Sequence, residues 1–275
     1  MTGSLDGRAD ALSPAARFAP GTFAPAPGRG GLIRMLSAQA RTEVLLTLRN
    51  GEQILLTLLI PLAVLVGLTL LTFVPMSSPR VDAVAPRVLA LAIMSSAFTG
   101  QAIALGFDRR YGVLKRLAAT AIPRWLIVAG RLCAALAVVV IQLVVLGVVA
   151  ALLGWSPSAA GILPAIGFVL LGTLSFGALG VLLGGALRAE IVLALANTVW
   201  FVLLVLGGLA SVSSGVPGAL REAALLLPSG ALAEGLYGVL GHGATGAAPV
   251  WECAVVLVVW GVVAGAIATR TTKLT

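Results

Sequence analysis

Charged side chains are scarce in this sequence. Only 10% of its 275 residues are Asp, Glu, Lys or Arg, and 59% are hydrophobic, whereas soluble globular proteins average about 25% charged and about 45–50% apolar residues. This composition excludes a soluble enzyme and a disordered chain. The net charge of +8 would suit nucleic acid, but membrane proteins gather Lys and Arg in cytoplasmic loops for topological reasons. We therefore predict a polytopic membrane protein that binds no nucleic acid.

Cysteine, histidine and lysine are also rare. Cys133, Cys253 and the single histidine form neither a disulfide framework nor a zinc motif, so we expect no metal site. A P-loop needs Gly-Lys followed by Ser or Thr, because its lysine reaches the nucleotide phosphates. Lys115 and Lys273 follow a leucine and a threonine instead. We expect no ATPase activity and no cofactor in this chain.

Ionisable residues are nearly absent from the centres of the apolar stretches. Proton- or sodium-driven carriers usually need a buried Asp, Glu or His, so this pattern disfavours an ion-coupled carrier. Aromatic residues make up only 5% of the chain. Because a polysaccharide exporter would be expected to stack sugar rings on aromatic side chains, the low content favours a lipidic or amphiphilic substrate or drug.

Long hydrophobic stretches dominate what is present. Six of them approach the length of about 20 residues that a helix needs to cross the hydrocarbon core. They cover residues 54–74, 88–107, 126–153, 162–187, 191–210 and 253–269. We predict an all-α membrane protein with six transmembrane helices in a domain that covers residues 54–270.

The N-terminal segments differ from these spans. Residues 1–30 carry prolines among Ala, Gly and scattered Arg, which predicts a disordered cytoplasmic tail. In residues 31–51 apolar side chains recur every four positions, with arginines mostly on the other side. This period predicts an amphipathic helix that lies in the cytoplasmic interface.

Two shorter apolar pieces precede the last span. Ala219–Leu227 and Ser229–Leu240 flank Pro228, and at 1.5 Å per residue each covers about half of a core of roughly 30 Å. We predict a re-entrant helical segment, containing Pro228 and Glu234, that enters and leaves on the outer side.

The distribution of Lys and Arg predicts the topology. With the N-terminus inside, 15 of the 18 basic residues fall in cytoplasmic segments, and only Arg80, Arg87 and Arg221 fall outside. The positive-inside rule therefore places both termini in the cytoplasm.

The stretch between the second and third spans has the densest charge. Five basic residues lie between Arg109 and Arg124, and Val113, Leu114 and Leu117 share one helical face. Asp108 is positioned to cap the start of this short helix. On physical grounds alone, the helix could equally be a basic anchor on anionic lipid.

This stretch resembles the cytoplasmic loop of the ABC-2 type permeases, the membrane subunits of type-2 ABC exporters. That loop runs acidic-Arg-acidic-x-Gly-Thr-Leu before a proline and the next span. Asp108, Arg109, Gly112 and Leu114 match, whereas Arg110 and Val113 depart from the pattern. The preceding amphipathic segment, six spans and the Leu-Pro-Ser before the last span agree with the family.

The resemblance implies a coupling helix that docks on a separate ATPase subunit. Its residues would be Asp108, Arg109, Arg110, Tyr111, Gly112, Val113, Leu114, Arg116 and Leu117. It also implies two ATPase copies, which hold ATP and Mg, and a second permease as a homodimer or paralogous heterodimer in the cell membrane. The alternative is a membrane scaffold or assembly factor, which a neighbouring reading frame for a P-loop ATPase would disfavour.

Uncharged polar residues within the spans admit two interpretations. They are Ser95, Ser96, Thr99, Gln101, Gln142 and Asn197. Each must find a partner away from lipid, and interhelical hydrogen bonds are the simpler explanation. The functional interpretation is that some of them line a substrate path between two permease copies.

Overall fold

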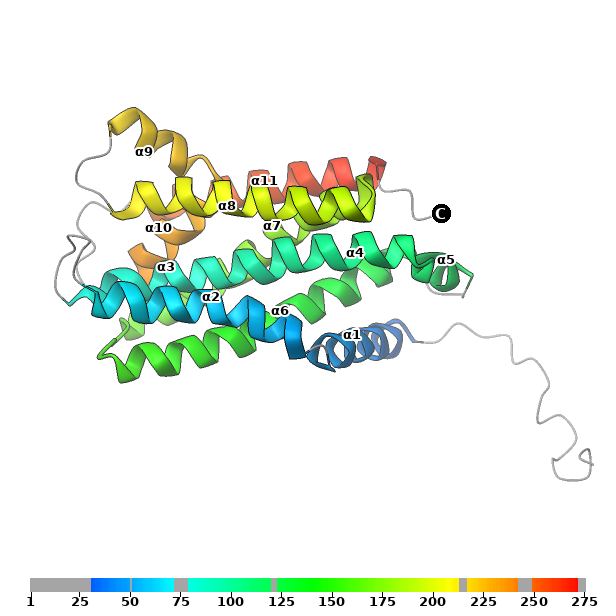
Figure 1. Ribbon diagram of the computed structural model, residues 1–275, viewed down its shortest axis with the longest axis horizontal. Helices are drawn as coiled ribbons and strands as arrows, with labels where there is room; N and C mark the ends of the chain where they lie inside the picture. The colour runs from blue at the N-terminus through cyan, green and yellow to red at the C-terminus, as the bar shows by residue number, and fades with distance from the viewer. Residues whose placement is uncertain are drawn as a thin grey trace, which may run out of the picture.

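The computed structural model describes residues 31–49, 51–71, 79–119, 123–212, 217–241 and 249–271, and the predicted tail at 1–30 lies outside them. The described residues form an all-helical bundle (Figure 1). Its elements are α1 (Leu32–Arg49), α2 (Gly51–Leu70), α3 (Arg80–Met94), the π-helix η3 (Ser95–Gly100), α4 (Gln101–Arg110), α5 (Val113–Ala118), α6 (Arg124–Leu152), the 3-10 turn η4 (Ala159–Gly161), α7 (Ile162–Ala186), α8 (Ala189–Val212), α9 (Gly218–Leu225), α10 (Pro228–Leu240) and α11 (Val250–Thr271).

Five helical segments are long and apolar enough to cross a membrane. They are Arg80–Arg110, Trp125–Leu152, Ala159–Ala186, Ala189–Gly207 and Val250–Thr271, and the bent pair α9–α10 would make a sixth if it counted as one span. These segments match the predicted spans two to six. Helices suit this setting because their backbone groups are satisfied within the segment. The prediction of an all-α membrane protein is confirmed.

The first predicted span corresponds to α2, whose described apolar part, Thr57–Leu70, is shorter than the five spans. The guanidinium of Arg80 explains where α2 ends. It donates to the carbonyl of Leu68 at 3.1 and 2.9 Å and to that of Leu71 at 2.7 Å. These are the orphan carbonyls of a helix C-terminus.

The second predicted span is longer than its hydrophobic run. It was expected at 88–107, but α3, η3 and α4 form one segment from Arg80 to Arg110. Pro86 lies inside α3 without ending it. The segment therefore brings Arg87, expected in an outer loop, into a helix among the buried residues of the core.

The predicted re-entrant segment is a bent helix pair. α9 and α10 meet at 92°, and Pro228 is the first residue of α10, a position where its missing N–H costs nothing. α10 is buried along most of its length, with Leu232 and Leu236 fully enclosed. On the α10 side of the break, Pro228, Ser229 and Gly230 are buried against protein, whereas Leu226 before it is 66% exposed.

The core lies where the span Arg80–Arg110 meets α7 and α10. Ile93, Phe176 and Leu232 are fully buried there. Gly184 of α7 permits a close approach to α4, since a Cβ on it would lie 2.5 Å from the carbonyl oxygen of Ala102. This packing fixes α4 against α7. It thereby also fixes the α4–α5 corner, which is the turn from Arg110 to Val113 together with the short helix α5.

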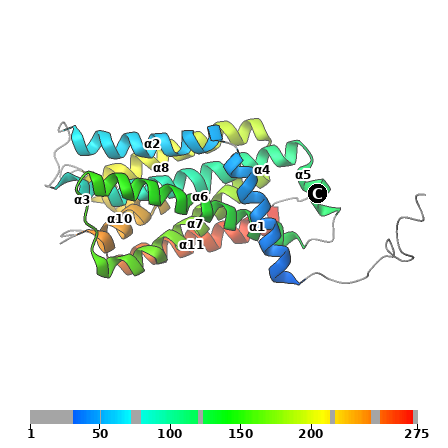
Figure 2. The same cartoon turned by 90° about the horizontal axis from the view of Figure 1, so that it is seen from below.

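Helix α1 lies apart from this core. None of its residues is buried, and it runs across the direction of the bundle helices at the end where α5 lies (Figures 1 and 2). Its close contact is with α6, where a Cβ on Gly130 would lie 2.5 Å from Cγ of Gln39. The interfacial position of this crosswise helix stays a prediction.

Candidate functional site

The α4–α5 corner is built around a glycine. Gly112 has φ = 69°, in the left-handed region, and it follows Tyr111, the C-cap of α4. The amide of Gly112 donates to the carbonyl of Arg109 at 3.2 Å. Because only glycine adopts this conformation readily, the chain reverses here and starts α5 at Val113.

Helix α5 turns its apolar face inward, toward its own chain. Leu114 is 3% exposed and packs with Leu105, Ile127, Val181 and Ala268, and Leu117 packs against the same cluster. The resemblance to ABC-2 permeases implies that Leu114 and Leu117 belong to a helix that docks on an ATPase subunit. Periodicity places Leu114 and Leu117 on one face but does not say what covers it, and here α4, α6, α7 and α11 do.

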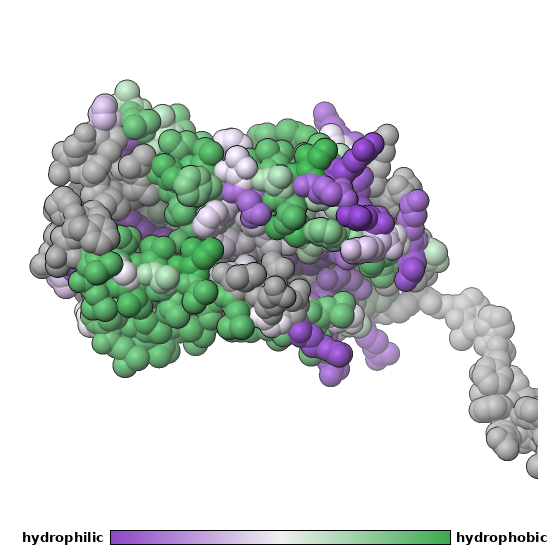
Figure 3. All heavy atoms as spheres, viewed as in Figure 1, coloured by the Kyte–Doolittle hydropathy of each residue, from purple (hydrophilic) through white to green (hydrophobic). Residues whose placement is uncertain are grey.

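The outward side of this corner is polar and aromatic. Tyr111 is 64% exposed, and Arg110, Lys115 and Arg116 are exposed too. Val113 is half-buried and lines a cavity behind α1. Hydrophilic residues gather at this end of the molecule beside a mostly hydrophobic surface (Figure 3).

Three arginine contacts tie this end together. Arg131 of α6 pairs with Asp108 of α4, and Arg110 pairs with Glu190 of α8. Arg109 donates to the carbonyls of Gly184 and Leu187 at 3.2 and 3.1 Å, at the end of α7.

One expectation about these charges is wrong. Asp108 does not cap α5, since it lies within α4 and its carboxylate neutralises Arg131. Arg131 itself is buried, at 4% exposure.

The predicted polar residues of the membrane interior surround the π-helix η3. Ser96 donates to the amide oxygen of Gln142 at 2.5 Å, and the Gln142 amide nitrogen donates to Thr57 at 3.0 Å. The indole of Trp200 donates to Ser95 at 3.0 Å. These bonds join α2, α6 and α8 to the π-helix. A π-helical turn inside an α-helical span often marks a functional site.

Most of these polar residues line two separate cavities and do not form one continuous substrate path. Ser96 and Gln101 line a cavity of about 290 Å³ beside α1 and α6. Ser95, Thr99 and Asn197 line a groove of about 300 Å³ between α2 and α8. Gln142 is 1% exposed and lies in the hydrogen-bonded chain.

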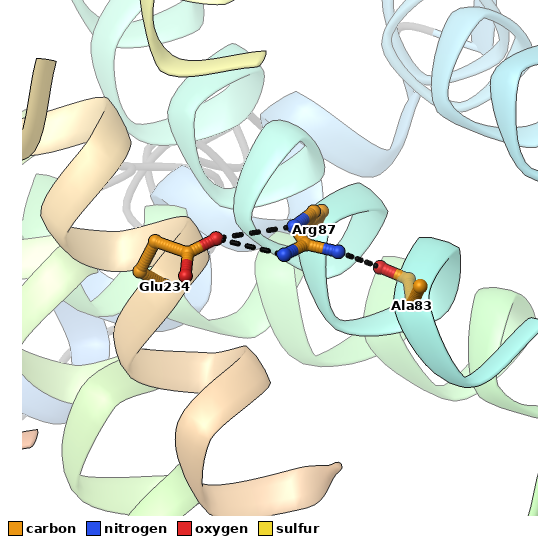
Figure 4. Close-up of polar contacts among 3 residues, drawn as sticks. All are labelled: Ala83, Arg87 and Glu234. Atoms are coloured by element: carbon orange, nitrogen blue, oxygen red, sulfur yellow. Dashed lines mark hydrogen bonds and ion pairs between the residues drawn. The ribbon is translucent and has the colours of Figure 1, made fainter. Parts of the chain in front are cut away.

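Sequence reasoning missed one ion pair in the core. Nε and Nη2 of Arg87 donate to one carboxylate oxygen of Glu234 at 3.2 and 2.9 Å, and Nη1 donates to the carbonyl of Ala83 at 2.8 Å (Figure 4). The guanidinium also lies 4.1 Å from the ring centroid of Tyr237. Arg87 and Glu234 each interrupt an apolar stretch of the sequence. Because they carry opposite charges, this common feature could have suggested that they form an ion pair.

Comparison with protein families agrees with this architecture. Residues 80–270, more than half of the chain, match the family model described as ABC-2 family transporter protein. The chain belongs to the ABC-2 family of transporter membrane proteins. A comparison with curated proteins gave no match.

The match covers most of the site. It begins at the first residue of α3 and ends within α11, so the corner, η3 and the Arg87–Glu234 pair belong to the ABC-2 permease domain. Such domains are typically non-catalytic, and ABC-2 permeases generally pair with ABC ATPases. Among the described residues, no group of three or more His, Cys, Asp or Glu side chains could hold a metal ion.

Proposed function

We propose that this permease is the membrane subunit of an ATP-driven exporter and that a separate ABC ATPase binds its α4–α5 corner. The supporting observation is the rigid mounting of α5. Leu114 is buried in the bundle, while Tyr111 and Arg116 point outward. A corner held in this way transmits a push from a partner to α4, α6 and α7. ATP and Mg are bound by the partner, not by this chain.

The corner faces the cytoplasm in this proposal, with both termini on the same side of the cell membrane. Basic residues support the orientation. α1, α4, α5 and the end of α11 carry most of them at one end, whereas Arg80, Arg87 and Arg221 lie toward the other. Lys and Arg accumulate on the cytoplasmic side of membrane proteins.

A second permease copy, identical or paralogous, covers the groove between α2 and α8. Asn197 is exposed on α8, on a helix whose other exposed residues include Leu193 and Phe201. An amide that faced lipid would lack a hydrogen-bond partner, so a protein face or a polar path is the better surrounding. Two ATPase copies serve the pair.

The cargo is amphiphilic or lipidic. The α2–α8 groove combines apolar walls from Ile60 and Ile103 with the hydroxyl of Thr99 and the amide of Asn197. The Thr99 hydroxyl is buried without a hydrogen-bond partner among the described residues. A molecule with an apolar body and a polar group fits this mixture.

The test is capture of a P-loop ATPase encoded by a neighbouring reading frame. Tyr111→Ala with Arg116→Ala removes two outward side chains of types that dominate interfaces, at about 2 kcal/mol each when well packed. We expect the double variant to insert and unfold like wild type, yet to lose ATPase affinity by roughly a hundredfold or more.

The matched control is Trp251→Ala with Arg221→Ala, which removes an exposed aromatic residue at the start of α11 and an exposed arginine of α9. It should leave capture unchanged. Wild-type capture by the Tyr111 and Arg116 variant would contradict docking at this corner. A neighbourhood without any ATPase gene would favour the scaffold or assembly factor.

A further inference from the structure

A cleft of about 420 Å³ opens beside the α4–α5 corner, against the turn between α7 and α8. Its basic lining residues are Arg109, Arg110, Lys115 and Arg188, and its acidic one is Glu190. Four cationic side chains against one carboxylate leave a net charge of about +3 in this lining. A cleft with that balance attracts an anion.

The four cations are not equally engaged. Arg110 is paired with Glu190, and Arg109 donates to two uncharged carbonyls, so its positive charge remains uncompensated. Lys115 and Arg188 are exposed, and neither makes an ion pair with another residue that the structure describes. Two side chains are therefore available to an incoming ligand, and the hydrogen-bonded guanidinium of Arg109 belongs to the same lining.

The cleft lies at the edge of the hydrocarbon layer. Glu190 belongs to its lining, and directly after it α8 exposes Ile191 at 50%, outside the α2–α8 groove. Exposed apolar side chains in a spanning helix face lipid chains, so the residues just before them lie at headgroup level. Phosphate groups of phospholipids occupy that level.

We propose that this cleft binds the phosphate headgroup of an anionic phospholipid, with Lys115 and Arg188 contacting its oxygens. Basic pockets between membrane helices suit such headgroups. Because Lys115 belongs to α5 and Arg188 to the α7–α8 turn, a bound lipid links the corner to the bundle from outside. The assignment to the cytoplasmic leaflet rests on the proposed orientation, whereas the binding itself does not.

The experiment uses the purified full-length permease without any ATPase, so its outcome is independent of the proposed function. Binding of phosphatidylglycerol in detergent is measured by native mass spectrometry. Phosphatidylcholine, a zwitterionic phospholipid without net charge, serves as the comparison. Each basic side chain near an anionic surface contributes about fivefold in affinity. Lys115→Ala with Arg188→Ala should therefore weaken phosphatidylglycerol binding roughly 25-fold and remove its advantage over phosphatidylcholine.

The matched control is Arg116→Ala with Arg270→Ala. Both side chains are exposed, lie at the same end of the bundle and do not line the cleft. Their removal should change binding less than twofold. An equal loss in this control would reduce the effect to general surface charge and overturn the proposal.

Two further arms distinguish the source of the anion. Inorganic phosphate at millimolar concentration should not displace the lipid, and full displacement would assign the cleft to a soluble phosphate compound. If the Lys115 and Arg188 variant bound lipid like wild type but no longer captured the ATPase, the cleft would belong to the protein partner and the lipid proposal would fail.

Discussion

Two ion pairs join helices near opposite ends of the span Arg80–Arg110. Arg87, near its beginning, binds Glu234 of α10, and Asp108, in its last turn, binds Arg131 of α6. The first pair is closed, because its guanidinium also contacts a carbonyl and the Tyr237 ring and the Glu234 side chain is 3% exposed. The second is more open on the side of its carboxylate, since Asp108 is 29% exposed, whereas its arginine is the more buried of the two, at 5% for Arg131 against 16% for Arg87.

The surroundings of Arg131 differ further. It lines the cavity of about 290 Å³ behind α1 together with Asp108 and Glu43, and its Nε has no hydrogen-bond partner among the described residues. Glu43 accepts a hydrogen bond from Gln39 at 3.0 Å and offers a second carboxylate in this lining. The Arg87 pair therefore fixes α10 in the bundle, whereas Arg131 shares its cavity with a second carboxylate, that of Glu43.

The largest effect should follow from breaking the closed pair. Glu234→Ala leaves the Arg87 guanidinium buried without a counter-charge, which costs about 3–5 kcal/mol when one member of a buried pair is removed. We expect a strong loss of stability in detergent, measured by thermal or denaturant unfolding. Replacing both residues, Arg87→Leu with Glu234→Leu, should recover much of it.

The control for this experiment is Glu222→Ala on α9, which removes an exposed carboxylate. Its effect should lie within about 0.5 kcal/mol. If Glu234→Ala and Glu222→Ala were equally mild, the Arg87–Glu234 pair would not hold α10, and the contrast between the two ends would be lost.

A smaller effect is expected at the open pair. Asp108→Asn removes the carboxylate but keeps an acceptor, and the adjacent cavity gives Arg131 access to Glu43 and to water. We expect a loss of about 1.5–3 kcal/mol in the same unfolding assay, which is the contribution of one hydrogen bond to a charged group. Asp108→Asn combined with Glu43→Gln should lower the free energy of unfolding by more than the sum of the two single changes. Strict additivity would mean that Glu43 does not replace Asp108 as the counter-charge of Arg131.

Much of the fold was predictable because apolar runs and proline carry local signals. Hydrophobic length located five spans, and Pro228 with its short flanking pieces indicated the bent pair α9–α10. Span ends were less predictable. Arg87 was assigned to a loop because a charge normally ends a hydrophobic run, and Glu234, which permits it to stay in the helix, lies 147 positions later.

The sequence indicated which residues belong to the candidate site better than it indicated what their side chains contact. Periodicity grouped Leu114 with Leu117, but their burial depends on α6, α7 and α11, which are distant in sequence. The π-helix at Ser95–Gly100 has no local signature that could have revealed it. The polar residues around it were recognisable, whereas their division between two cavities required the packing of α2 and α8.

The smallest effect compares two glycines at the two ends of the bundle. Gly112 (φ 69°) turns the chain from α4 into α5, and Gly154 (φ 93°) follows the end of α6. No atom lies within 4 Å of a Cβ placed on either residue, so an alanine costs backbone strain alone. Gly112→Ala and Gly154→Ala should each lower stability by about 1 kcal/mol.

Only Gly112→Ala should also weaken ATPase capture, because a change at this corner rotates Tyr111 and Arg116 relative to the buried Leu114. Capture at matched stability is the measurement, with the Gly154 variant as reference. In this variant Tyr111 and Arg116 are still present and lose only part of their contacts with the ATPase. The loss of ATPase affinity should therefore be smaller than in the Tyr111→Ala and Arg116→Ala double variant. Equal capture by the two variants would mean that α5 reaches its partner without the fixed angle at Gly112, and the corner would then serve as a flexible tether.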